Sequence, residues 1–473
     1  MENTHKKYDI IIIGAGAGGL NVAYGAHGIG LKVLLIDKED RTIGGDCLNY
    51  GCVPSKALIH VAQLVRDGKE SNRFGVSSSG IVDIGKVMEY VTNKQDTIRT
   101  HENATYLRKQ GIDVVLGSVS FVGATSVTLE GTIYSAKKVI IATGSRPRKL
   151  ELKGIEKVKT FDNENIFSIT TLPKNMVIIG TGPIGLEIGQ AFSAFGTKVA
   201  IIGPALLEKE DPDIVSVLQE RLLQDSIDLF LGYKPMEVKD ETTLVIQNEK
   251  GETKEVLFDM LFVSIGRALN VENLGLEKAG IKLNERGGII VDKYLRTTNK
   301  DVLVCGDVAG NYMFTHASEL HASVILHNLF SPFKKALQTD AMSWVTYTYP
   351  EIATFGLSGK ELTKRGVVYE TIEQEFKDSD RAIVDEHRFG KVKLHIDKEG
   401  IVLGGSVIGH NAGEIVQELM LLQANKMKIS SLLKKVYPYP TASRVNRTLA
   451  LSQLKKRLTN ANKSILRLLF GLV

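Results

Sequence analysis

The same glycine-rich pattern occurs twice in the chain, at a constant offset of 166 residues. The first copy places its glycines at Gly14, Gly16 and Gly19. The second copy places them at Gly180, Gly182 and Gly185. Each copy follows a short apolar run, typical of a buried parallel strand, and precedes a helical pattern and a second apolar run. Glycines in this setting let a pyrophosphate approach the start of the helix, so the repeat predicts two dinucleotide-binding domains.

The two copies differ where the second strand ends. Asp37 stands 21 residues after Gly16, where a carboxylate can accept hydrogen bonds from a ribose. We expect Asp37 and its neighbour Lys38 to contact the first cofactor. The equivalent position of the second copy is Gly203, so that copy lacks the acid that would hold a free ribose and repel a 2′-phosphate. It also lacks a nearby arginine. The pattern leaves both NADH and NADPH open as the second cofactor, with a slight preference for NADPH.

Length and composition limit the class of protein. A chain of 473 residues is too long for one hydrophobic core, so several domains are expected. The net charge of +5 is too small over this length to indicate nucleic-acid binding. Three cysteines do not make a secreted disulfide scaffold. The apolar run 10–13 is too short for a signal peptide or a membrane span. We therefore predict a cytoplasmic protein with no nucleic-acid partner and no metal site.

Two of the three cysteines lie five positions apart in a glycine-rich stretch. Gly45 and Gly51 give the backbone around Cys47 and Cys52 the freedom to turn, and Pro54 stands where a helix can begin. The start of a helix favours the thiolate, which is the reactive form of cysteine. The stretch favours a redox pair over a pair of buried structural cysteines. The third cysteine, Cys305, lies within an apolar run and is expected to be an inert core thiol.

Three further apolar runs end in turn-forming residues. Thr143 and Gly144 follow the first run, where we expect the chain to cross from the first domain to the second. Gly266 and Arg267 follow another run and mark the expected return crossing. Asp307 follows the third run, and its spacing fits equally a ligand for cofactor hydroxyls and a cap of the strand end.

The character of the chain changes after residue 343. Strand-like runs at 344–347, 392–396 and 401–408 precede helical patterns at 413–425 and 442–454, which together indicate an α+β unit. The segment 455–473 is basic and carries apolar residues at roughly helical spacing. This stripe packs on its own protein or lies on an anionic membrane surface as a peripheral contact. Its apolar members are Leu458, Ile465, Leu468, Leu469, Phe470 and Leu472.

Taken together, these motifs resemble the class I pyridine nucleotide–disulfide oxidoreductases, the family of dihydrolipoamide dehydrogenase, glutathione reductase and mercuric reductase. The resemblance covers nearly the whole chain, and the run from Gly45 to Lys56 is its most specific part. It implies an α/β fold with two Rossmann-like domains, FAD in the first and NADH or NADPH in the second, and a C-terminal α+β dimerisation domain. The expected boundaries are 1–155 and 276–340 for the FAD domain, 156–275 for the NAD(P) domain, 341–455 for the dimerisation domain and 456–473 for the basic tail.

The resemblance also implies roles for single residues. Cys47 corresponds to the exposed interchange thiol and Cys52 to the thiol packed against the flavin. Lys56 and Glu187 correspond to an ion pair near the flavin ring, and Asp307 to the residue that holds the flavin chain. The family likeness further implies a homodimer in which the C-terminal unit of one subunit completes the site of the other.

The chain departs from the disulfide-reducing members near its C-terminus. Tyr439 and Arg444 replace the histidine and glutamate that serve the interchange thiol in those enzymes. Phenols ionise near pH ~10 and imidazoles near ~6.5, so a tyrosine is a poor general base at neutral pH. Mercuric reductase also has a tyrosine at this position, and Asp46 and the run 314–319 are similar to a mercuric-reductase-like branch. Against that branch, the C-terminus has no vicinal cysteine pair, and there is no N-terminal metal-binding domain. Within the run, His316 fits a catalytic histidine or a structural one at a helix start.

These observations lead to one main functional hypothesis and two alternatives. The main hypothesis is an electron relay from NAD(P)H through FAD to a Cys47–Cys52 disulfide, and on to a disulfide, a thiol-binding metal ion or a small oxidant. The first alternative is a dihydrolipoamide dehydrogenase with an unusual acid–base group, for which Tyr439 is the candidate. The second alternative is a non-catalytic flavoprotein that acts as a redox sensor or a membrane-docked module.

Overall fold

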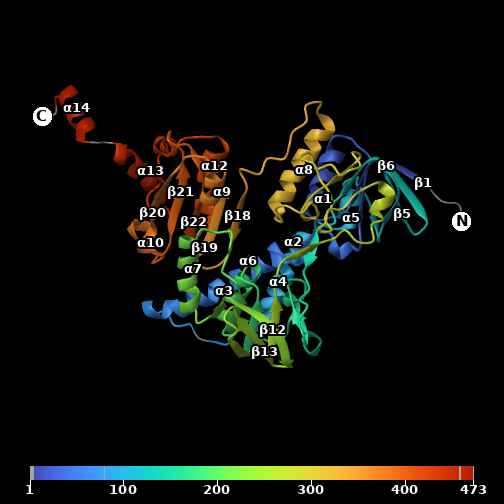
Figure 1. The fold of residues 1–473 in the computed structure, drawn as a ribbon, viewed down its shortest axis with the longest axis horizontal. Coiled ribbons are helices and arrows are strands. Elements are labelled where there is room, and N and C mark those ends of the chain that lie inside the picture. Colours follow the sequence, from blue (N-terminus) through green and yellow to red (C-terminus); the bar gives the residue numbers. More distant parts are fainter. Residues whose placement is uncertain (1–4, 79, 458–459, 472–473) are drawn as a thin grey trace. The chain divides into compact units, whose positions relative to one another are not determined.

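The computed structural model describes residues 5–78, 80–457 and 460–471, and contacts divide the chain into two compact units (Figure 1). Unit 1 consists of Met1–Pro204 and Phe230–Leu337. Unit 2 consists of Ala205–Leu229 and Gln338–Val473. The domain boundaries expected from the sequence stay predictions, because this division by contacts does not test them.

Unit 1 contains a seven-stranded sheet with the order β3-β2-β1-β6-β5-β4, in which β17 also pairs with β6. Strands β1, β2, β3, β6 and β17 are parallel where they pair, and Ile10 to Ile13 are buried, as a continuous apolar run predicts. The helices α1 and α8 pack against each other. The strands are β1 (His5–Ile13), β2 (Val33–Asp37), β3 (Asp113–Leu116), β4 (Ser120–Gly123), β5 (Ser126–Leu129), β6 (Thr132–Ile141) and β17 (Val302–Val304).

A second sheet of five strands has the order β11-β10-β9-β15-β8 and repeats the strand–glycine loop–helix arrangement. Its strands are β8 (Thr160–Phe161), β9 (Asn175–Ile179), β10 (Lys198–Gly203), β11 (Asp228–Leu231) and β15 (Met260–Val263). Two smaller sheets accompany it: β12 (Tyr233–Asp240), β13 (Thr243–Asn248) and β14 (Thr253–Leu257), and the pair β7 (Ser145–Pro147) and β16 (Arg267–Leu269). The two glycine loops thus follow β1 and β9, each at the end of a parallel strand.

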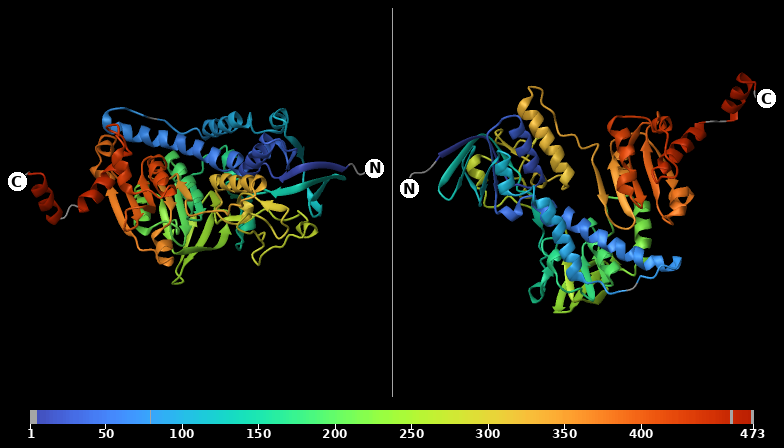
Figure 2. Two further views of the ribbon diagram at one scale, coloured as in Figure 1. Left: turned by 90° about the horizontal axis from the view of Figure 1, so that it is seen from above. Right: turned by 180° about the vertical axis from the view of Figure 1, so that it is seen from behind.

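The helices of unit 1 place the cysteine stretch beside the second glycine loop. Helix α3, the long blue helix of Figure 2, packs against α4 and α6. It begins at Cys52, two residues before Pro54, where the sequence predicted a helix start. The helices are α1 (Ala17–Gly28), α2 (Gly45–Asn49), α3 (Cys52–Glu70), α4 (Ile84–Arg99), α5 (Ala104–Lys109), α6 (Pro183–Phe195) and α8 (Thr315–Phe330).

Unit 2 is built on a five-stranded antiparallel sheet with the order β18-β19-β22-β21-β20. Helix α7 joins this unit although it belongs to an earlier part of the chain, and it contacts β22. The strands are β18 (Ser343–Thr346), β19 (Glu351–Gly356), β20 (Glu370–Glu375), β21 (Lys391–Ile396) and β22 (Val402–Gly409). The helices are α7 (Pro212–Gln224), α9 (Gly359–Lys364), α10 (Asp380–Val384), α11 (Ala412–Ile415), α12 (Gln417–Ala424), α13 (Arg444–Arg457) and α14 (Asn460–Leu469). The mixed α/β class and the C-terminal α+β unit are as predicted.

Helix α14 lies within the basic segment 455–473, as its helical spacing predicts. Two of the predicted apolar positions of that segment, Leu458 and Leu472, lie outside the described residues. Within the described ranges, none of the helices is long and apolar enough to cross a membrane.

Candidate functional site

The short helix α2 and the first turn of α3 bring Cys47 and Cys52 within hydrogen-bond contact of each other. Both are free thiols in the structure. Gly45 has a positive φ of 62°, and a Cβ added there would lie 2.6 Å from the Cα of Gly16. Only glycine therefore lets the cysteine stretch pack against the first glycine loop.

Three groups surround the sulfur of Cys52. The thiol of Cys47 hydrogen-bonds to it, the hydroxyl of Thr315 lies 3.4 Å away, and the ammonium of Lys56 adds a positive charge. These groups outweigh the effect of burial and lower the pKa of Cys52 to about 6. The pKa of Cys47 is raised, because its proton is held in the hydrogen bond to Cys52 and the thiol is partly buried. The arrangement favours a Cys52 thiolate paired with a protonated Cys47.

The two cysteines differ in exposure and in the helix that holds them. Cys52 is exposed and Cys47 is half-buried. Cys47 lies within α2, which contacts both α3 and α4, whereas Cys52 is the first residue of α3.

Lys56 and Glu187 form the ion pair that the family resemblance implied, with 2.8 Å between Nζ and Oε2. Lys56 lies one turn beyond Cys52 on α3, and Glu187 lies in the first turns of α6. The Glu187 side chain is only 6% exposed. Because a buried carboxylate is costly without a partner, Lys56 holds this contact between α3 and α6 as well as facing Cys52.

The first glycine loop fits an anionic dinucleotide. Gly14 has a φ of 106°, and a Cβ there would lie 2.3 Å from the carbonyl oxygen of Ala142. Gly16 caps α1 without a side-chain hydrogen bond, so the backbone donors at the start of α1 face the space where a pyrophosphate would lie. Asp37, at the end of β2, accepts the backbone N–H of Ala15 at 2.6 Å and that of Lys38 at 2.8 Å. The Asp37 carboxylate thus orients the first glycine loop.

The second glycine loop fits an anionic dinucleotide in the same way. A Cβ on Gly180 would lie 2.3 Å from the carbonyl oxygen of Ser264, whereas a Cβ on Gly182 would meet nothing within 4 Å. The space above this loop is therefore open, and Gly182 caps α6 without a side-chain hydrogen bond. Gly203 packs tightly, since a Cβ there would lie 2.7 Å from Cγ2 of Thr181. A side chain at position 203 would therefore have to displace Thr181.

The three strand ends singled out in the sequence meet in one polar cluster of unit 1. Arg267 forms an ion pair with Asp46 at 2.9 Å and approaches Asp307 at 3.7 Å. Ser145 donates its hydroxyl to Asp307 at 2.5 Å. Burial raises the pKa of Asp307 despite these partners. The contact between Arg267 and Asp46 was not predicted, and it offsets the negative charge of the residue next to Cys47.

The remaining predicted residues of these turns shape the backbone. Thr143 donates its hydroxyl to the carbonyl oxygen of Asn270 at 2.6 Å. Gly144 and Gly266 have positive φ values of 69° and 109°, and a Cβ on either would meet nothing within 4 Å. They are suited to a close approach by a ligand.

Thr315 is a site residue that the sequence reasoning missed. It is the first residue of α8 and contacts Cys52, 263 positions earlier in the chain. Its place in the run 314–319 was the available signal, but the pattern there pointed to His316 as the candidate residue. His316 is instead exposed and stacks on Phe314, with 5.2 Å between the ring centroids. Cys305 is buried, and burial raises its pKa to about 12, as expected of an inert core thiol.

Tyr439 lies in unit 2, whereas the other predicted catalytic residues lie in unit 1. Its side chain is 68% exposed. The guanidinium of Arg444 lies 5.1 Å from the centroid of the Tyr439 ring, so the two residues that replace the family's histidine and glutamate contact each other.

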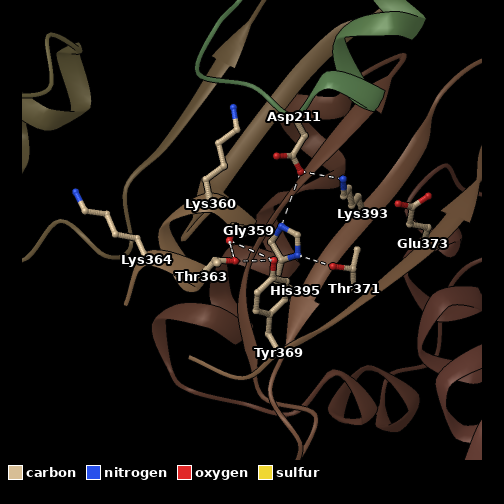
Figure 3. A pocket seen from close by; sticks show the side chains of 10 residues that line it. All are labelled: Asp211, Gly359, Lys360, Thr363, Lys364, Tyr369, Thr371, Glu373, Lys393 and His395. Carbon is tan, nitrogen blue, oxygen red and sulfur yellow. Dashed lines mark hydrogen bonds and ion pairs between the residues drawn. The ribbon is translucent and has the colours of Figure 1, made fainter. Parts of the chain in front are cut away.

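Unit 2 also contains a cavity of about 750 Å³ between α9 and β21 (Figure 3). Lys393 contacts Asp211 at 3.0 Å, and His395 lies 3.9 Å from the same carboxylate. Thr371 hydrogen-bonds to the other ring nitrogen of His395. These groups satisfy one another and tie the segment before α7 to the sheet. Among the described residues, no group of three or more His, Cys, Asp or Glu side chains is placed to hold a metal ion.

Comparison with known proteins gives a consistent result over most of the chain. The pyridine nucleotide-disulphide oxidoreductase family matches residues 8–322, and the dimerisation domain of that family matches residues 342–450. Dihydrolipoyl dehydrogenase of Buchnera aphidicola (subsp. Acyrthosiphon pisum) is 32% identical over 92% of this chain and 93% of its own length. Mercuric reductase of Lysinibacillus sphaericus is 28% identical over 92% of this chain and 80% of its own length.

Solved structures with the same fold include the HOCl-induced flavoprotein disulfide reductase RclA from Escherichia coli. The match has a TM-score of 0.83 and 25% identity, and it covers 94% of this chain and 99% of RclA. A Cu(II) complex of RclA matches with a TM-score of 0.82 and 24% identity over the same shares of both chains. The chain therefore belongs to the pyridine nucleotide-disulphide oxidoreductases, flavoprotein enzymes that use FAD and NAD(P)H, and it carries the dimerisation domain of that family, which supports a homodimer.

Proposed function

We propose that the Cys47–Cys52 pair is the redox centre of this enzyme and passes electrons from NAD(P)H to a thiol-reactive acceptor, a soft metal ion or a disulfide. The observation that carries the proposal is the contact of the two thiols at the start of α3, with Thr315 and Lys56 beside Cys52. This arrangement stabilises one thiolate at neutral pH and keeps a second sulfur within reach of it.

The sulfur chemistry balances over one cycle. Reduction of the Cys47–Cys52 disulfide takes up two electrons and one proton, breaks the S–S bond and leaves the Cys52 thiolate and the Cys47 thiol. FAD, when bound, supplies the two-electron transfer between NAD(P)H and this disulfide. When two electrons leave for the acceptor, the S–S bond forms again and the proton of Cys47 is released.

The residues around the pair have distinct proposed roles. Cys47 contacts the acceptor, and Cys52 faces the flavin. Lys56, held by Glu187, favours the thiolate of Cys52. The proposed contacts with FAD are Gly14, Gly16, Gly19, Asp37, Lys38, Gly45, Thr143, Gly144 and Asp307. The proposed contacts with the nicotinamide cofactor are Gly180, Gly182 and Gly185 in the second glycine loop. Gly266 and Arg267, at the return crossing between the domains, are further proposed cofactor contacts.

A metal ion is the acceptor that the departures from the family pattern favour. Tyr439 and Arg444 stand where disulfide-reducing members have a histidine and a glutamate, and a phenol is a poor general base at neutral pH. A phenol oxygen can, however, contact a metal ion that is held by thiolates. One relative is a mercuric reductase, and one solved structure of the same fold is a Cu(II) complex. Hg(II) and Cu(II) are therefore the first acceptors to test.

A second candidate is dihydrolipoamide dehydrogenase activity, which the 32% identity to the Buchnera enzyme over 92% of the chain favours. Here Tyr439 would take the acid–base role. The two candidates differ in their substrates, so one acceptor panel separates them.

The test is a stopped-flow experiment on the FAD-loaded protein. NADH and NADPH are each used to reduce the enzyme without oxygen, and reoxidation is then followed with Hg(II), Cu(II), lipoamide, glutathione disulfide and quinones. We expect reoxidation by a metal ion to be much faster than by lipoamide. Rapid NADH formation from dihydrolipoamide would instead establish the second candidate. Fast reoxidation only by quinones would contradict both.

We also propose that the enzyme is a cytoplasmic homodimer in which Tyr439 of one subunit completes the cysteine site of the other. The dimerisation-domain match and the family resemblance support this proposal. Light scattering should then give about twice the chain mass of 51.8 kDa. Tyr439→Phe should change acceptor turnover and leave the reduction of bound FAD by NAD(P)H at its normal rate, and a change in the latter alone would contradict the role.

A further inference from the structure

Helix α14 (Asn460–Leu469) has two chemically distinct faces. Ile465, Leu468 and Leu469 are spaced three and four positions apart and share one face. Lys463 and Arg467, four positions apart, share the opposite face. The apolar side chains are not covered: Ile465, Leu466, Leu468, Leu469 and Phe470 are 42 to 80% exposed.

The charge around this helix has one sign. The segment 455–473 contains five Lys and Arg residues and no Asp or Glu. Its charge of +5 equals the net charge of the whole chain, so the other 454 residues are neutral in sum. A concentrated positive charge beside an exposed apolar face complements a surface that carries negative charge and has apolar groups just beneath it.

The helix lies outside the matched family domains, because the dimerisation domain ends at residue 450. It is also too short to cross a membrane. We infer that α14 docks the enzyme on the surface of a membrane that contains anionic lipids. The apolar face enters the boundary between headgroups and acyl chains, and the basic face contacts lipid phosphates.

The inference does not depend on the acceptor of the proposed redox centre, and it concerns where that centre works. The binding of an amphipathic helix to a membrane strengthens with the apolar area that it buries and, as a second contribution, with its attraction to anionic lipids. The basic residues of the segment 455–473 supply this electrostatic contribution, so binding should depend on both lipid charge and salt.

The test is sedimentation of the full-length, FAD-loaded protein with vesicles. One set consists of phosphatidylcholine, and the other of phosphatidylcholine with phosphatidylglycerol. We expect at least about tenfold tighter binding to the anionic vesicles at low salt, and loss of that binding at high salt. The double variant Leu468→Glu/Leu469→Glu should abolish binding. The matched control, Val368→Glu, changes an apolar residue of unit 2 that is 83% exposed and lies outside the helix, and it should bind like the wild type.

The FAD content and NAD(P)H oxidation of each variant show that it is folded. No binding of the wild type, equal binding to both vesicle sets, or retained binding by the double variant would each overturn the inference. A double variant with a smaller mass in light scattering would show that the apolar face covers a second copy of the chain, which also contradicts membrane docking.

Discussion

Three groups from different parts of the chain converge on the sulfur of Cys52. Cys47 lies five positions earlier, Lys56 lies one helical turn later, and Thr315 comes from a distant helix. Hydrogen bonds and a positive charge favour the ionised form, so the pKa of Cys52 falls to about 6. A thiolate is therefore the main form of Cys52 at neutral pH, and it is lost as the pH falls through about 6.

Replacing Lys56 tests the electrostatic part of this arrangement. In Lys56→Gln the positive charge is gone, and we expect the pKa of Cys52 to rise by about one unit. The measurement is the pH dependence of iodoacetamide alkylation at Cys52 in the reduced protein, mapped by mass spectrometry. Lys69→Gln is the matched control, because Lys69 lies on the same helix and bonds to the carbonyl oxygen of Ala194. An unchanged midpoint in Lys56→Gln, or an equal shift in the control, would refute the role of Lys56.

The residues of the site differ in how far the sequence could predict them. The contact between Lys56 and Glu187 was predicted, because the family resemblance implied an ion pair at these two positions. Thr315 was not predicted, because its contact with Cys52 joins residues 263 positions apart and depends on how α8 packs.

At the scale of elements, helix α8 links the redox pair to the end of β17. Its first residue contacts Cys52, and its His321, only 1% exposed, accepts the backbone N–H of Gly306 through Nδ1 at 3.1 Å. This hydrogen bond requires a neutral imidazole with its proton on Nε2. Burial lowers the pKa of His321 to about 4.

The buried histidine predicts a pH dependence of stability. The unfolded chain takes up a proton near pH 6.5, and the folded chain only near pH 4, so folding loses stability as the pH falls through this window. His321 should account for a loss of about 3 kcal/mol. In His321→Asn, which keeps an acceptor but does not titrate, the free energy of unfolding by urea should depend less on pH between 6.5 and 4. The exposed His60, changed to Asn, serves as the control and should keep the wild-type dependence. A wild-type slope in His321→Asn would contradict this account.

Helix α7 and the residues before it are tied to the sheet of unit 2 by charge. Lys393 lies 2.7 Å from Asp213 and 3.0 Å from Asp211, and its side chain is 14% exposed. Burial opposes the charge of Lys393, but the two carboxylates outweigh it and raise its pKa. The sequence predicted neither contact, because periodicity identifies a helix and not the sheet on which it packs.

Lys393→Met should leave both carboxylates without this partner and lower the free energy of unfolding by about 2 kcal/mol. The single tryptophan of the chain, Trp344, reports on this region, since its indole N–H donates to Glu210 at 2.5 Å within unit 2. Urea titration followed by tryptophan fluorescence therefore measures the effect. Lys360→Met, which changes an exposed lysine of the same cavity, should have an effect below about 0.5 kcal/mol. Equal effects of the two changes would rule out the ion cluster as a stabilising contact.

For the whole molecule, most of the fold could be predicted from the two repeated glycine loops. Each loop follows a parallel strand. The close contacts at Gly14 and Gly180 admit only glycine, so the sequence marks both loops clearly. The family, its enzymatic class and its cofactors are confirmed by the matches over residues 8–322 and 342–450. The acceptor was not predictable to the same degree, because the chain departs from the family pattern at Tyr439 and Arg444.

In the proposed relay electrons leave the enzyme through Cys47 and Cys52, and the variant Cys52→Ser separates this route from direct transfer out of the flavin. The measurement compares the variant with the wild type in two steps: reduction of bound FAD by NAD(P)H, and turnover with the best acceptor of the panel. We expect normal FAD content, FAD reduction within about twofold of the wild type, and acceptor turnover lower by about a hundredfold or more. Acceptor turnover at the wild-type rate in Cys52→Ser would contradict the proposed relay, because electrons would then leave the flavin directly.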